Sequence, residues 1–265
     1  MSDDPMSEDA LAACAERLAR GDPDRFAALM AAPLAARRRL LPLYAFNLEV
    51  ARAPWVSAEP AIGAMRLSWW REVLEEIAEG AVVRRHDVAC ALAGVLDAEG
   101  ARRLDDLVIA RWADLELSPF ADAEALDDYL QRTGGRLMQV AGRVLGVRDA
   151  DAALGEIGTA AALANWCLAV PELISRGRRP LPGPEAGEAE SVAALGRLAH
   201  RRLAALRAAR GGLQAGARPA ALAAWRAPAI LAKVARNPAC VLAGRAAESE
   251  FRRRASLILA AVRGI

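Results

Sequence analysis

The chain has 265 residues, of which 54% are hydrophobic and 26% are charged, so it can bury one large core in a single domain over residues 1–265. Its formal net charge of +2 argues against a nucleic-acid-binding protein. The four cysteines, Cys14, Cys90, Cys167 and Cys240, are far apart and form no CxxC pair. We therefore expect reduced thiols in a cytoplasmic protein rather than a disulfide framework or a zinc site.

The first half of the chain shows helical periodicity throughout. The expected helices cover residues 7–20, 22–30, 35–50, 59–80, 87–97 and 99–117. Asp22 is placed to cap the second of these helices, and Gly100 is expected to separate the last two. The acidic N-terminal residues do not resemble a signal peptide, and no apolar run looks long enough to cross a bilayer.

The second half of the chain continues the same pattern. Its expected helices cover residues 122–145, 149–176, 188–210, 219–225, 228–235, 239–247 and 248–262, with a Pro/Gly loop at 180–187. Asp122 is placed to cap the first of them. No alternating strand pattern and no internal repeat is visible. The sequence therefore predicts an all-α protein.

Two segments carry most of the functional information. The first contains Tyr44-Ala45-Phe46, and the second runs from Leu163 to Pro182 as LANWCLAVPELISRGRRPLP. Both resemble signature segments of the squalene/phytoene synthase family, whose enzymes join two isoprenyl diphosphates head to head. The positions that stay in register in the second segment are Asn165, Gly177, Arg178, Leu181 and Pro182. The phrase RLSWWREVLEEI at residues 66–77 resembles one that is common in the family's bacterial branch.

The catalytic carboxylates of the family do not survive in either segment. In the first, the Asp positions fall on Ala51, Arg52 and Trp55. In the second, they fall on Ala169 and Leu173.

Their loss matters because two Asp residues four apart share one face of a helix, and Mg²⁺ prefers carboxylate oxygens and bridges them to diphosphate. Leu168 also replaces the Arg that the resemblance implies, and Glu172 is the only carboxylate left in the segment. One carboxylate makes a poor metal site, so we expect neither a metal nor a cofactor.

The resemblance implies the isoprenoid-synthase fold, a helical bundle around one central apolar cavity. We expect Tyr44, Phe46, Asn165 and Trp166 to line or flank that cavity. Tyr44, Phe46 and Asn165 are the candidate ligand-binding residues, and no catalytic residue is assigned.

We expect a non-catalytic member that works by binding, similar to the branch of respiratory complex I assembly factors with a squalene/phytoene synthase domain. Its partners would be a lipid or isoprenoid in the cavity, or a respiratory-complex subunit. The alternative is a prenyl-diphosphate transferase of the squalene/phytoene synthase type with displaced ligands, which would require Mg²⁺.

Other polar residues suggest structural roles. His86 and His200 have no neighbour at metal-ligand spacing, and we expect ordinary surface roles for both. The pairs Asp105-Asp106 and Asp127-Asp128 diverge by about 100° on a helix and cannot chelate alone. Thr133-Gly134-Gly135 is a small-residue step that favours close packing.

The C-terminal segment FRRRASLILAAVRGI is basic on one side and apolar on another. It is typical either of a final helix that packs onto the domain or of a peripheral helix at an anionic membrane surface. We therefore expect a cytoplasmic location, with contact at the inner face of the membrane as the open alternative.

Overall fold

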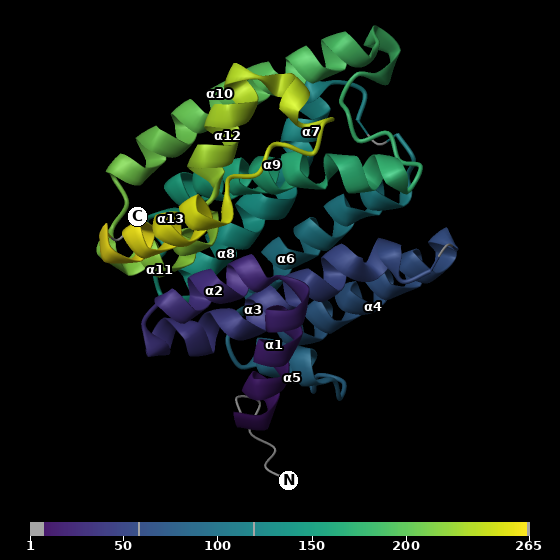
Figure 1. Ribbon diagram of the computed structural model, residues 1–265. Helices are drawn as coiled ribbons and strands as arrows, with labels where there is room; N and C mark the ends of the chain where they lie inside the picture. The colour runs from purple at the N-terminus through teal and green to yellow at the C-terminus, as the bar shows by residue number, and fades with distance from the viewer. Residues whose placement is uncertain (1–7, 58, 119, 264–265) are drawn as a thin grey trace.

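The computed structural model describes residues 8–57, 59–118 and 120–263 (Figure 1). Over these residues the chain forms helices and no strand, as the sequence predicts. The α-helices are α1 (Glu8–Gly21), α2 (Pro23–Ala31), α3 (Leu34–Arg52), α4 (Pro60–Glu79), α5 (Asp87–Ala93), α6 (Ala98–Ala110), α7 (Ala123–Leu130), α8 (Arg136–Val144), α9 (Asp151–Ser175), α10 (Glu188–Gly211), α11 (Arg218–Ala221), α12 (Ala227–Arg236) and α13 (Glu250–Arg263).

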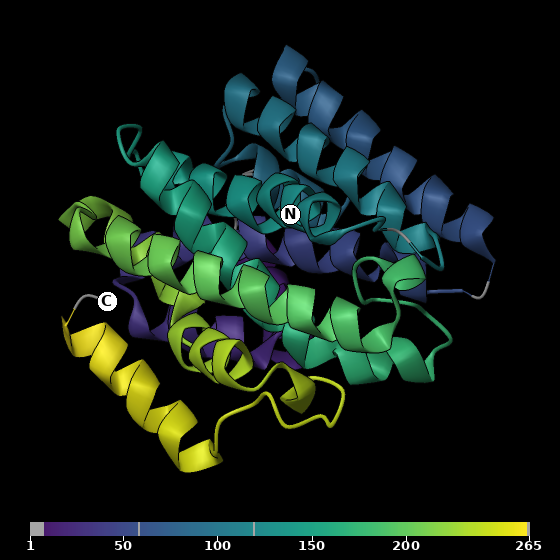
Figure 2. The same ribbon diagram turned by 90° about the horizontal axis from the view of Figure 1, so that it is seen from above.

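Helix α9 lies at the centre of the bundle. In Figure 1 it runs between α10 and α12 on one side and α3 and α4 on the other. It contacts α8, α10 and α12 along its length. Figure 2 shows α10 stretched across the near face and α13 at an outer edge. Since α9 has neighbours on several sides, its sequence is apolar around most of its circumference.

The apolar composition of α9 corrects one expectation. By length and composition, Asp151–Ser175 could cross a membrane, although we expected no run of that kind. Leu154, Ile157 and Leu163 are nonetheless completely buried against other helices. Burial in the protein core explains the composition, because a helix with neighbours on several sides is apolar for the same reason as one in lipid.

Several predicted helix boundaries are confirmed and others are wrong. Asp22 and Asp122 cap α2 and α7, with their Oδ1 atoms accepting hydrogen bonds from backbone N–H groups at 3.0 and 2.7 Å. Gly100, however, lies buried inside α6. The break comes earlier, where Asp97 caps α6 through a 2.8 Å bond from the Gly100 N–H. The predicted helix at 239–247 is reduced to a 3₁₀ turn at Pro238–Cys240.

The predicted helix over 122–145 is divided by a π turn at Gln131–Gly135, which joins α7 to α8. A Cβ added to Gly134 would lie 2.4 Å from the Cβ of Ala162 and 2.7 Å from the carbonyl oxygen of Gly158. The backbones of the π turn and α9 are therefore in direct contact, which only glycine allows. The predicted packing role of this small-residue step is confirmed.

Several of the other polar residues have structural partners. His86 is half-buried rather than an ordinary surface residue: its Nδ1 accepts from the N–H of Ala89 at the start of α5, and its ring contacts Trp69 and Trp70. Asp127 forms two hydrogen bonds to Arg202, at 2.6 and 2.5 Å. All four cysteines are free.

Candidate functional site

A cavity of about 240 Å³ lies between α3, the segment from α7 through the π turn to α8, and α9. Its lining is largely apolar, with contributions from Leu130, Leu137, Met138 and Ala162. Charged side chains also line it, and they are Arg25, Arg111, Asp114, Glu116, Arg178 and Arg179. The cavity therefore combines apolar surface with both cationic and anionic groups.

Four of the five positions where the resemblance implies a carboxylate line this cavity, and the fifth, Arg52, does not. Ala51 of α3 and Trp55 of the following 3₁₀ turn η1 (Ala53–Trp55) line it from one side, and Ala169 and Leu173 of α9 line it from the other. Residues that are more than a hundred positions apart in the chain thus line one cavity, where the resemblance implies two metal-binding motifs. The side chains at these positions are two methyl groups, an indole and an isobutyl group.

The predicted ligand-binding residues do not all lie in the cavity. Tyr44 and Asn165 line it, and so does Trp166. Phe46 does not: its ring is fully buried in the core and packs edge-on against Trp70, with 5.1 Å between the ring centres.

The helical repeat explains the difference, because residues two apart on a helix point in nearly opposite directions. Asn47, which shares a face with Tyr44, takes the place that we gave to Phe46. The spacing 44, 47, 51 was the signal that could have identified it.

Tyr44 is fixed by two contacts at the cavity wall. Its hydroxyl donates to the backbone carbonyl of Ala220 at 3.4 Å, and the guanidinium of Arg25 lies 5.2 Å from its ring centre. Burial raises the pKa of Tyr44 to about 12. The hydroxyl is therefore a neutral hydrogen-bonding group at physiological pH, with no role as a base.

A polar cluster that the sequence did not reveal lies at another part of the wall. Arg111 donates from Nη1 to the Oδ2 of Asp114 at 3.1 Å and to the Tyr129 hydroxyl at 2.7 Å. The same hydroxyl donates to the Oδ1 of Asp114 at 2.7 Å. Burial raises the pKa of Tyr129 well above its usual value. Both oxygens of Asp114 are thus engaged by neighbouring side chains.

The turn that follows α9 forms part of the cavity lining through Arg178, Arg179 and Pro180. The guanidinium carbons of Arg176 and Arg178 lie 5.1 and 5.0 Å from the centre of the Trp55 ring. Arg178 also donates to the backbone carbonyl of Glu116, and the indole N–H of Trp166 donates to the carbonyl of Pro180 at 3.1 Å. These contacts fasten the turn to the cavity wall.

The donor set does not fit a Mg²⁺–diphosphate centre. No group of three or more His, Cys, Asp or Glu residues that could hold a metal occurs in the part of the chain that the structure describes. The carboxylates on the cavity lining are Asp114 and Glu116. Asp114 is occupied by Arg111 and Tyr129, and a hard divalent cation needs several oxygen ligands at once.

Comparison with known proteins gives a consistent result. A family model described as squalene/phytoene synthase matches residues 18–257. Among curated proteins, NADH dehydrogenase (ubiquinone) complex I, assembly factor 6, is 26% identical over 183 residues in both Bos taurus and Homo sapiens. The matched part is 64% of this chain and 52% of either relative. The chain thus spans about half the length of the curated relatives it matches.

Solved structures confirm the predicted fold class. A dehydrosqualene synthase in complex with ligand superposes with a TM-score of 0.77 at 15% identity, covering 97% of this chain and 96% of that one. Squalene synthase HpnC from Alicyclobacillus acidocaldarius gives a TM-score of 0.70 at 17% identity, covering 87% of this chain and 95% of that one. At these identities the likeness establishes a shared helical fold and leaves the chemistry to be argued from the site.

Proposed function

The chain belongs to the squalene/phytoene synthase family, and from this premise we propose that it is a non-catalytic member that works by binding. The observation that carries the proposal is the lining of the cavity by Ala51, Trp55, Ala169 and Leu173. These side chains stand where the resemblance places the carboxylates of both metal motifs. None of the four offers an oxygen to a cation.

The size of the cavity supports the same proposal. At about 240 Å³, it lies below the range of roughly 300–1,000 Å³ that is typical of small-molecule sites. A head-to-head condensation requires two isoprenyl chains in one site at the same time. A cavity of this volume suits a segment of a single chain, so we propose that its ligand is one lipid or isoprenoid tail.

The curated relatives suggest a second partner. Their printed name describes assembly of respiratory complex I, and we propose that this chain likewise binds a respiratory-complex subunit. It would do so in the cytoplasm, at the inner face of the membrane. In this proposal the helical domain serves as a binding scaffold, and a bound tail would stabilise the folded state by filling its cavity.

The second candidate function is the prenyl-diphosphate transferase with displaced ligands. The observation in its favour is the presence of Asp114 and Glu116 on the lining of the same cavity. Against it, Asp114 is held by Arg111 and Tyr129. A transferase would have to release that carboxylate before it could bind Mg²⁺.

One assay separates the two functions. The purified protein is incubated with farnesyl diphosphate and Mg²⁺, and released pyrophosphate is measured over time. We expect no release above the rate without protein. Mg²⁺-dependent release would establish the transferase and refute the binding proposal.

The partner proposal has its own test. A deletion strain should show reduced assembly of its respiratory complex with unchanged isoprenoid composition. An unchanged complex together with missing isoprenoid products would contradict it.

A further inference from the structure

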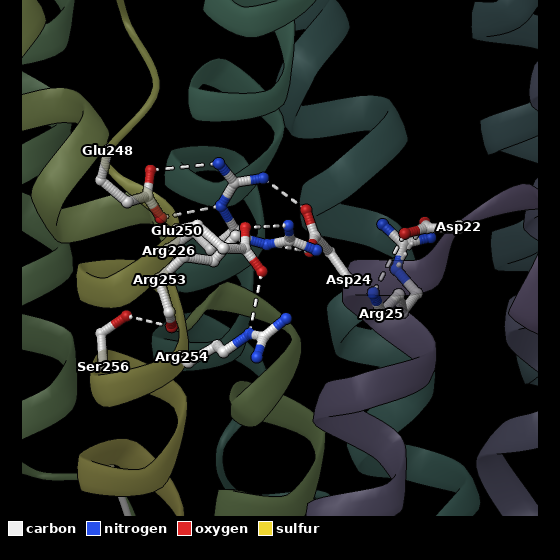
Figure 3. Close-up of polar contacts among 9 residues, drawn as sticks. All are labelled: Asp22, Asp24, Arg25, Arg226, Glu248, Glu250, Arg253, Arg254 and Ser256. Carbon is white, nitrogen blue, oxygen red and sulfur yellow. Dashed lines mark hydrogen bonds and ion pairs between the residues drawn. The ribbon is translucent and has the colours of Figure 1, made fainter.

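Helix α13 is attached to the domain by a network of ion pairs along one face (Figure 3). Arg253 pairs with Asp24 of α2, with 2.6 Å between Nη2 and Oδ1. Arg226, at the start of α12, also pairs with Asp24 and pairs with Glu248 at 2.9 Å. In Figure 3, dashed lines join the Asp24 carboxylate to both arginines. Because several charges share the network, it fixes the orientation of α13 more firmly than an isolated surface pair would.

The same face of α13 contributes apolar packing. Leu257 and Ala260 pack against the small cluster that contains Trp225 and Leu222. Arg253, Leu257 and Ala260 follow one another at spacings of four and three, so they lie on one side of the helix. This side faces the domain, and the packing role that the sequence suggested for the C-terminal segment is therefore present.

The opposite side of α13 is also apolar, and it is open to solvent. Phe251, Ile258 and Val262 are 82%, 63% and 80% exposed. With Ala255 they form the spacing i, i+4, i+7, i+11, which places them in one stripe along the helix. At about 100° per residue, the centre of this stripe lies nearly 180° from the packed face. Leu259, which is 49% exposed, widens it on one side.

Arginines border the stripe on both sides. At about 100° per residue, Arg252 falls beyond Leu259 on one edge and Arg254 falls on the other. Arg254 is 78% exposed and has a 3.0 Å contact with Glu250, itself 56% exposed. Arg252 is exposed and has no carboxylate partner among the residues that the structure describes. An exposed apolar stripe between cationic borders is the pattern of a helix that lies in a membrane interface.

We propose that α13 is a docking surface for an anionic lipid bilayer, with the stripe of Phe251, Ala255, Ile258 and Val262 inserted among the acyl chains and the bordering arginines on the head groups. The ion pairs to Asp24 hold the helix so that the stripe faces outward.

A second copy of this chain fits the surface less well. A two-fold contact through the stripe would bring the arginines of the two copies together, whereas anionic head groups complement them. The proposal does not depend on what the cavity binds.

The test is co-sedimentation of the full chain with lipid vesicles. One set of vesicles is phosphatidylcholine alone, and the other contains phosphatidylglycerol as well. We expect binding to the anionic vesicles that is several times stronger than binding to the neutral ones, and that weakens as salt is added. Failure of the wild-type chain to sediment with anionic vesicles would overturn the proposal.

Two kinds of variant locate the surface. Ile258→Glu should reduce binding to anionic vesicles by about tenfold or more, because it places a charge in the stripe. Val82→Glu is the matched control: Val82 is 95% exposed in the loop between α4 and α5, and its variant should bind as the wild type does. The double variant R252Q/R254Q should lose the preference for anionic over neutral vesicles. Equal losses in the Ile258 and Val82 variants would contradict the assignment to α13.

Two further measurements keep the test decisive. The melting temperature of Ile258→Glu should match that of the wild type; if it does not, Val262→Glu, at an even more exposed position, replaces it. Sedimentation velocity without lipid should give the same mass for wild type and variant. A dimer in the wild type that becomes a monomer in Ile258→Glu would assign the stripe to a second copy and overturn the membrane proposal. Vesicle binding leaves the cavity untouched, so its failure would overturn the docking surface without bearing on what the cavity binds.

Discussion

The guanidinium carbon of Arg178 lies 5.0 Å from the centre of the Trp55 indole ring, over its face. Arg178 matches the family's signature segment, whereas Trp55 stands where the resemblance implies a carboxylate. An aromatic face attracts a cation through its quadrupole, without a metal and without a formal negative charge. The indole thus holds this arginine at a position where the resemblance implies an acidic residue.

Removal of the indole should loosen the turn that follows α9. Trp55→Ala deletes the surface on which both Arg176 and Arg178 rest. We expect a loss of about 1–2 kcal/mol in the free energy of unfolding, measured by urea titration. Trypsin should also cleave faster after Arg176 and Arg178. Trp55→Phe keeps an aromatic face and should lose less on both measures; an equal loss would show that size rather than cation–π attraction matters.

Reintroduction of the carboxylates should not restore an enzyme. Ala169→Asp with Leu173→Asp places two charges in a largely apolar cavity wall, at a cost of about 2–4 kcal/mol in unfolding free energy. We expect a lower melting temperature and no condensation product, because Ala51 and Trp55 remain unsuited to Mg²⁺. The uncharged pair Ala169→Asn with Leu173→Asn should be less destabilised. Measurable head-to-head product from the double Asp variant would show that the site is nearly intact.

Diphosphate and Mg²⁺ together should leave the melting temperature unchanged. A ligand at 100 times its dissociation constant adds about 2.7 kcal/mol to the free energy of unfolding. The walls offer few free oxygens for a metal, so we expect no Mg²⁺-dependent increase with farnesyl diphosphate. Farnesol, which has the same tail without the charged group, is the control for occupation of the cavity by the tail alone. A shift that appears only when Mg²⁺ is present would refute the prediction.

Stability should fall on mild acidification because of His86. Burial lowers the pKa of His86 in the folded state, so the unfolded chain takes up its proton first as the pH falls. Neutral His86 therefore contributes to the free energy of unfolding. This contribution is complete above the pKa of His86 in the unfolded chain, near 6.5, and is lost as the pH falls towards its pKa in the folded chain. Protonation also removes the Nδ1 acceptor that caps α5. His86→Asn, which keeps a capping oxygen, should show a flatter pH dependence of unfolding between about pH 7.5 and 5.5.

The contact between the π turn and α9 should not tolerate a single methyl group. Gly134→Ala would place a Cβ 2.7 Å from the carbonyl oxygen of Gly158, and overpacking of this kind costs about 1–3 kcal/mol or more. Gly211→Ala at the end of α10 has no neighbour within 4 Å and should be neutral. Equal melting temperatures for the two variants would mean that α9 can move away without cost.

The sequence predicted the helical class and the location of the site for a physical reason. Helices are read from local periodicity, and the resemblance implied that Tyr44 and Asn165 lie at one cavity, which both residues line. The prediction was wrong about which face of α3 turns inward near Phe46, because apolar residues surround that helix and only the spacing 44, 47, 51 distinguishes the cavity face. The cluster of Arg111, Asp114 and Tyr129 was missed because its members come from different segments, and only the fold brings them together.

The π turn at Gln131–Gly135 also determines which residues form one wall of the cavity. Residues 129, 133 and 137 all line it, although positions four apart drift by about 40° in a regular α-helix. The wider π turn, with hydrogen bonds from i to i+5, absorbs that drift. Deletion of one residue there would leave both flanking helices intact, yet it would rotate Leu137 and Met138 off the wall and present different side chains to whatever the cavity holds.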